Sequence, residues 1–173
     1  MTDEQVRIRG YLTAQGAKLS PGEIIDKVRA AMDQLRAAAH AVPAGRFDER
    51  PAPEEWSANE VMAHVVTAGG HFGGAIARLL DGRAGGGVRD QIERDVPRRS
   101  ASEWWATLEQ DRAALFARVR AADPQGAIEG TVEHPFFGPL NWRETLLFMR
   151  LHDLDHAGQL HKISAALAVG HRA

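Results

Sequence analysis

The stretch WSANEVMAHV, residues 56–65, combines a helix start with a candidate functional side chain. Ser57 and Glu60 form the pattern of a capping box, in which each side chain bonds the backbone N–H of the other residue. Apolar residues then recur at helical spacing until Leu80. The stretch therefore predicts a helix from about residue 58 to residue 80, with His64 two turns from its start.

The same start pattern occurs three more times, as Ser20 with Glu23, Ser100 with Glu103, and Asn141 with Glu144. Each opens a run of apolar residues spaced three and four apart, as on one face of a helix. The last run, from Trp142 to about Leu167, is apolar almost all the way round, which predicts a well-buried helix. No alternating pattern predicts a strand. We expect an all-α protein whose elements pack as an antiparallel four-helix bundle.

The rest of the chain divides around this bundle. Residues 1–19 form an N-terminal extension that we expect to add a short docking helix, and residues 169–173 form a C-terminal tail. The bundle domain itself spans residues 20–168. The segment from His134 to Pro139 is apolar but unsuited to a helix, because it holds two prolines and a glycine. We expect this segment to fold back over one end of the bundle.

Composition excludes several classes of protein. The chain has 173 residues, of which 44% are hydrophobic and 25% charged, and its formal net charge is −2. Charges of both signs are spread along it, so no basic face for nucleic acid is expected. No stretch approaches the roughly 20 apolar residues of a membrane span, and the polar N-terminus does not resemble a signal peptide. There is no cysteine, which excludes disulfides and thiolate sites. We expect a soluble, cytoplasmic protein.

Histidines provide the functional signal. His152 and His156 are four residues apart and therefore lie on one face of the last predicted helix, with Gln159 on the same stripe. Such a pair chelates one metal ion in many metalloenzymes, although two polar side chains at a helix surface are the usual alternative. Here the helix is otherwise apolar, and ligation would satisfy both rings. With His64 as a third ligand, the sequence predicts an open three-histidine site for a divalent metal ion.

Carboxylates near these histidines have two interpretations each. Glu60 lies one turn before His64 and is a candidate general base, but it also belongs to the capping box. Asp155 is a candidate proton acceptor, and with Asp153 a candidate acceptor for an imidazole N–H group, although both would also suit solvent. His71 is a candidate for the cavity wall.

Of the remaining histidines, His134 is a candidate only if its segment covers the site. We assign no metal role to the others: His40, His161 and His171. The pair is also not the HExxH signature of zinc peptidases, because Asp-Leu-Asp separates its histidines.

Three segments together resemble the DinB-like (YfiT-like) metalloenzyme superfamily: WSANEVMAHV at 56–65, His134–Leu140 with its Phe-Gly, and HDLDHAGQL at 152–160. The resemblance covers roughly residues 20–168. It implies a four-helix bundle with a divalent metal ion, often nickel or zinc, on His64, His152 and His156. It also implies a homodimer.

Several functions are compatible with this resemblance. Members of this superfamily include S-transferases and an isomerase that use a diffusible low-molecular-weight thiol, such as bacillithiol or mycothiol. No motif in this sequence indicates which thiol would be used. Our first hypothesis is a metal-dependent enzyme that acts on a small molecule by thiol S-transfer, in detoxification or stress response. A metal-dependent hydrolase is the second. The alternative is a non-enzymatic, stress-linked protein in which the metal stabilises the bundle.

Overall fold

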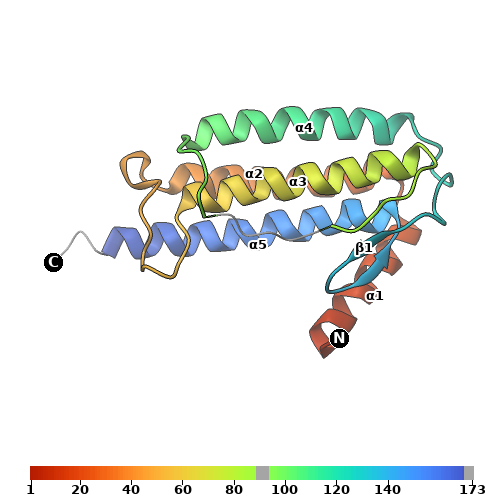
Figure 1. The fold of residues 1–173 in the computed structure, drawn as a ribbon, viewed down its shortest axis with the longest axis horizontal. Helices are drawn as coiled ribbons and strands as arrows, with labels where there is room; N and C mark the ends of the chain where they lie inside the picture. Colours follow the sequence, from red (N-terminus) through yellow and green to blue (C-terminus); the bar gives the residue numbers. More distant parts are fainter. Residues whose placement is uncertain (89–93, 170–173) are drawn as a thin grey trace.

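The structure, a computed structural model, describes residues 1–88 and 94–169. It confirms the all-α bundle, whose long helices are α2 (Pro21–Ala41), α3 (Ala58–Leu80), α4 (Ala101–Ala121) and α5 (Trp142–Val169). Helices α2 and α3 each pack against both α4 and α5. Helices α4 and α5 therefore lie diagonally opposite each other, at the two edges of the bundle in Figure 1.

All four predicted capping boxes are present. In the box that begins α3, Ser57 N donates to Glu60 Oε2 at 2.8 Å, and Glu60 N donates to Ser57 Oγ at 3.2 Å. The other three boxes, at the starts of α2, α4 and α5, show the same two reciprocal bonds. Because each box satisfies two otherwise unpaired backbone donors, the helix starts coincide with the predicted positions.

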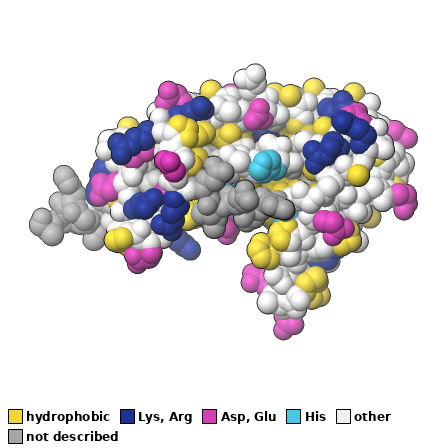
Figure 2. Space-filling view, viewed as in Figure 1, with side chains coloured by type: hydrophobic (Ala, Val, Ile, Leu, Met, Phe, Trp, Pro, Cys, Tyr) yellow, Lys and Arg dark blue, Asp and Glu magenta, His cyan; other side chains and the backbone are white. Residues whose placement is uncertain are grey.

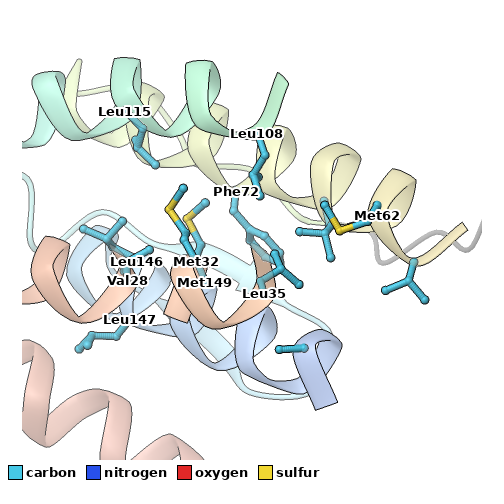
Figure 3. Close-up of a cluster of buried hydrophobic side chains, with 14 of the residues drawn as sticks. Val28, Met32, Leu35, Met62, Phe72, Leu108, Leu115, Leu146, Leu147 and Met149 are labelled. Atoms are coloured by element: carbon cyan, nitrogen blue, oxygen red, sulfur yellow. The ribbon is translucent and has the colours of Figure 1, made fainter. Parts of the chain in front are cut away.

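The apolar faces of the four helices meet in one core. Figure 3 shows side chains from every helix pointing into it: Val28, Met32 and Leu35 from α2, Met62 and Phe72 from α3, Leu108 and Leu115 from α4, and Leu146 and Met149 from α5. Each fully buried side chain of this kind stabilises the fold by about 1.5–3 kcal/mol. This core sets the distance between α3 and α5, the two helices that carry the candidate ligands.

A helix precedes the bundle. Helix α1 (Asp3–Lys18) opens with a further capping box between Thr2 and Gln5 and projects from one end of α5 (Figure 1). Arg143 of α5 holds its C-terminal end, because the Arg143 guanidinium donates to the carbonyls of Gly16 and Leu19. A short 3-10 helix covers Ala44–Arg46, after α2. Residues 170–173 of the predicted C-terminal tail lie outside the described part of the chain.

The expectation of no strand was wrong for one segment. Strands β1 (Val132–His134) and β2 (Gly138–Leu140) form an antiparallel hairpin between α4 and α5. Strands of three residues are too short to show an alternating pattern, so the sequence did not reveal them. Gly138 adopts a positive φ of 69°, which helps the chain to turn. The hairpin lies beside α1, where Arg9 donates to the carbonyls of Phe137 and Pro139.

The surface agrees with the charge pattern of the sequence. Figure 2 shows basic and acidic side chains interspersed over the visible face, without a patch of one sign. In the described part of the chain, no helix is both long enough and apolar enough to cross a membrane.

Asn59 connects the start of α3 to the start of α4. Its Oδ1 accepts from Trp104 Nε1 at 2.7 Å and from Arg99 N at 3.1 Å, while its Nδ2 donates to Pro97 O at 3.1 Å. Asn59 is only 2% exposed, so water does not replace these bonds when they are lost.

We expect Asn59→Ala to lower the free energy of unfolding by about 2–4 kcal/mol, because it leaves the buried Trp104 N–H and two backbone groups without partners. Urea unfolding measures this change. Gln125→Ala removes an exposed amide and should change stability by less than about 0.5 kcal/mol. Equal effects of the two substitutions would contradict the assigned role of Asn59.

Candidate metal centre

The three predicted histidines meet between α3 and α5. His64 comes from α3, and His152 and His156 come from successive turns of α5. All three are buried, with 8–9% of their surface exposed. His152 Nε2 lies 3.2 Å from His64 Nε2 and 3.2 Å from His156 Nε2. The direct packing of α3 on α5 therefore brings three imidazole nitrogens to one point.

The donor set fits a divalent metal ion. In a tetrahedral zinc site with Zn–N bonds of about 2.1 Å, ligand nitrogens are about 3.4 Å apart. The observed separations of 3.2 Å come close to this value without rearrangement of either helix. One ligand atom from each histidine lies within 4.8 Å of the others, so the three rings together can hold one ion.

Gln159 selects the tautomer of His156. Its Oε1 lies 2.9 Å from His156 Nδ1, and because an amide oxygen only accepts, Nδ1 carries the proton. His156 Nε2 then presents its lone pair to the other rings. Burial, together with the neighbouring His152, lowers the pKa of His156 to about 4. The ring is therefore neutral near pH 7, which is the form that binds a metal ion.

A cavity of about 510 Å³ opens beside the histidines. Beyond the three rings, its walls are largely apolar and come from α1, the segment before α3, the hairpin turn and α5: Ile8, Trp56, Phe137, Phe148, Leu151, Asp155 and Gln159. The Trp56 ring stacks over that of His156 at 6.4 Å and meets that of His64 edge-on at 5.3 Å. The cavity thus combines a cluster of nitrogen ligands with an aromatic lining.

The sequence did not identify most of this lining. The sequence predicted that the segment from His134 to Pro139 folds back over one end of the bundle, but it did not single out Phe137. Nothing indicated Ile8, because α1 was treated only as an extension. Trp56 stands directly before a helix cap, a position that also suits a purely structural residue. These contacts depend on how α1 and the hairpin sit on the bundle, which no local pattern specifies.

The two candidate catalytic carboxylates lie in different places. Glu60 is buried and bonds Arg50 through both oxygens as well as Ser57 N. Burial opposes its ionisation, but these bonds outweigh that effect and lower the pKa of Glu60. Glu60 does not line the cavity, so the structure places it in the helix cap. Asp155 is exposed and lines the cavity beside the histidines.

The other described histidines stay outside the ligand cluster. His134 is buried in an aromatic group, with ring centroids 4.4 Å from Phe148, 4.8 Å from Phe137 and 6.1 Å from Phe72. His71 is exposed and does not line the cavity. Two more lie away from it, His40 and the exposed His161, while His171 lies outside the described residues.

His156 should make the stability of the metal-free protein depend on pH. The unfolded ring has a pKa near 6.5 and the folded ring a pKa of about 4, so the unfolded chain takes up a proton first as the pH falls. The stabilising contribution of His156 is therefore full above pH 6.5 and is lost towards pH 4. Between pH 7 and pH 5 we expect a loss of about 2 kcal/mol, which His156→Ala should remove.

Urea unfolding at both pH values, with a chelator present, tests this dependence. The comparison uses the change with pH within each protein, because His156→Ala also leaves a void. His161→Ala, which removes an exposed histidine from the same helix, should keep the pH dependence of the parent. An unchanged dependence in His156→Ala would contradict the assigned burial of a neutral ring.

Two solved structures are similar to this fold. TT2238, described as a four-helix bundle protein, is 24% identical, with a TM-score of 0.64 over 83% of this chain and 99% of the other. YfiT from Bacillus subtilis, described as a probable metal-dependent hydrolase with an unusual four-helix bundle topology, is 14% identical. Its TM-score is 0.69 over 86% of this chain and 87% of the other. At these identities the likeness establishes the fold alone.

Sequence comparison identifies the family. No curated protein matches the chain. The profile of the DinB superfamily, however, matches residues 15–160, which include all three histidines, the whole of α2, α3 and α4, and α5 as far as Leu160. Since this match spans most of the sequence, the chain belongs to the DinB superfamily.

Proposed function

We propose that this protein is an enzyme that binds one divalent metal ion, zinc or nickel, through His64, His152 and His156 and acts on a small molecule. The observation that carries the proposal is the meeting of three buried Nε2 atoms at the wall of a 510 Å³ cavity. An apolar cavity of about 150 Å³ holds a benzene-sized molecule, so this cavity has room for a larger one.

The chemistry follows from a three-nitrogen site with an open position. When bound, the metal ion supplies a Lewis acid that lowers the pKa of a coordinated water or thiol. The chain supplies the surroundings. Trp56 and Phe148 pack against the rings of His64 and His152, and this apolar surrounding strengthens electrostatic interactions at the buried histidines. Asp155, at the cavity wall, is placed to accept a proton from a reacting group.

Thiol S-transfer is the leading reaction, and metal-assisted hydrolysis is the second. S-transfer requires a diffusible thiol, because the chain contains no cysteine. The similarity to YfiT, which is described as a probable metal-dependent hydrolase, supports the second reaction. In either case, Asp155 is the only charged residue among the described lining residues, so the cavity favours an uncharged and largely apolar substrate. The proposal includes the homodimer and the cytoplasmic location expected from the sequence.

A non-enzymatic metal-binding role is the competing proposal. It draws on the position of the ligands, because an ion shared by α3 and α5 would connect two helices of the core and add its binding energy to folding stability. The aromatic cavity beside the ligands favours the enzyme, since a purely structural ion needs no room for a substrate.

We expect the protein to bind close to one zinc or nickel ion per chain, and a His152→Ala/His156→Ala variant to bind almost none. Elemental mass spectrometry of tag-free protein measures this content. His71→Ala/His161→Ala is the matched control, because it removes exposed histidines from the same two helices. A parent that stays metal-free after loading with zinc or nickel would overturn the three-histidine site.

The cavity can be tested at Ile8. For metal-loaded protein we expect measurable conjugation of a low-molecular-weight thiol to chlorodinitrobenzene, or hydrolysis of nitrophenyl acetate. Ile8→Asp should lower kcat/KM about tenfold or more for the reaction that occurs, because it places a charge in the apolar wall. Val6→Asp places the same charge on the exposed side of α1 and should have little effect.

Metal content measured on both variants separates binding of the ion from binding of the substrate. Loss of activity in Ile8→Asp with full metal content would support the cavity as the substrate site. Equal activity in the two variants would contradict that assignment. Failure of the loaded parent in both reactions would favour the non-enzymatic role.

A further inference from the structure

A buried ion pair crosses the centre of the bundle. Arg112 of α4 is 2% exposed and Asp153 of α5 is fully buried, and Arg112 Nη2 lies 3.0 Å from Asp153 Oδ1. Because α4 and α5 are diagonally opposite (Figure 1), the arginine side chain must pass through the core to reach the carboxylate. On its way the guanidinium passes Gly69 of α3, where a Cβ would lie in van der Waals contact with Arg112 Nη2, at 3.4 Å.

Stability does not explain this pair. Arg112 Nε, Arg112 Nη1 and Asp153 Oδ2 are buried and have no hydrogen-bond partner among the described residues. Withdrawing two charges from water is unfavourable unless the remaining donors and acceptors are also satisfied. Apolar side chains of similar volume at such positions are often at least as stable. An ion pair with three unsatisfied atoms in an otherwise apolar core therefore points to a role beyond folding.

The Asp153 carboxylate lies near His152, on the side of the ring that points away from the other two histidines. His152 turns Nε2 towards His64 and His156, and its other nitrogen, Nδ1, lies 4.0 Å from Asp153 Oδ1. A negative charge on that side favours the tautomer with the proton on Nδ1, which leaves the lone pair on Nε2. The neighbouring ligand shows the same arrangement, because Gln159 fixes the proton of His156 on Nδ1. Metal-binding histidines are commonly supported in this way.

We propose that Asp153, held in place by Arg112, is a positioning residue for His152. Its carboxylate keeps the proton of that ring on Nδ1 and Nε2 directed at the metal ion. Arg112 supplies the counter-charge that allows an acidic side chain to stay in the core. The proposal rests on the three-histidine metal site of the proposed function, and it assigns to two core residues a role in setting the strength of that site.

The competing explanation is that the pair only connects α4 to α5. The variant Arg112→Met/Asp153→Leu separates the two, because it removes both charges together and refills the space with apolar atoms. We expect its urea midpoint to equal or exceed that of the parent. We also expect its zinc dissociation constant, measured by competition with a chromophoric chelator, to rise about 10- to 100-fold.

Glu4→Gln/Arg7→Gln is the matched control, since it removes an ion pair whose two side chains are 73% and 80% exposed and should leave zinc affinity unchanged. A folded Arg112→Met/Asp153→Leu variant that binds zinc as tightly as the parent would overturn the proposal and leave the pair structural. A parent that binds no zinc would instead overturn the metal site itself, so the two failures can be told apart.

A second measurement needs no core substitution. Long-range ¹H–¹⁵N correlation spectra of the zinc-loaded parent near pH 7 report which imidazole nitrogen carries a proton and which binds the ion, and the signals of His152 are assigned by their loss in His152→Ala. We expect His152 to bind zinc through Nε2 and to carry its proton on Nδ1, the nitrogen beside Asp153. Binding of zinc through His152 Nδ1 would overturn the proposal, whether or not the double variant folds.

Discussion

Three imidazole nitrogens that meet in a buried space place the strongest constraint on this molecule. Each ring needs a fixed tautomer and orientation, and the rings come from two helices, so the distance between α3 and α5 must be kept within a fraction of an ångström. The apolar core maintains that distance by close packing, which tolerates little change in volume. The rigid bundle therefore fixes the positions of the three histidines, which lie on helices rather than on loops.

The capping boxes and the helical spacing of the apolar residues allowed much of the bundle to be predicted from the sequence. The four boxes from Ser20 to Glu144 marked the helix starts because they are local chemistry, complete within four residues. The closeness of His152 and His156 could be predicted because helical geometry places them on one face. The hairpin at residues 132–140, the cavity wall at Ile8 and the Arg112–Asp153 pair could not be predicted in this way. Each depends on contacts between segments far apart in the sequence.

The features that local sequence patterns predicted lie in the bundle, and several of those that they missed lie in α1 and the hairpin. The bundle carries the three histidines, whereas α1 and the hairpin, which lie outside it, provide Ile8 and Phe137 to the cavity. Arg9 connects these two outer elements through backbone carbonyls of the hairpin. A change in either element can therefore alter the shape of the cavity without moving the histidines. Such a separation allows the shape of a cavity to vary while the bundle and its histidine cluster stay the same.

Two buried carboxylates of the bundle, Glu60 and Asp153, differ in how completely they are hydrogen-bonded. Glu60, one turn from His64, is fully occupied by Arg50 and by the cap of α3, so its burial is explained by the start of a helix. Asp153, next to His152, has a buried partner but keeps an unsatisfied oxygen, and no helix cap accounts for it. Both carboxylates neighbour a ligand in the sequence, and their hydrogen bonds distinguish them. Asp153, the carboxylate with an unsatisfied oxygen, lies 4.0 Å from His152 Nδ1, the ring nitrogen that points away from the other histidines. A negative charge at that position supports a metal-binding imidazole.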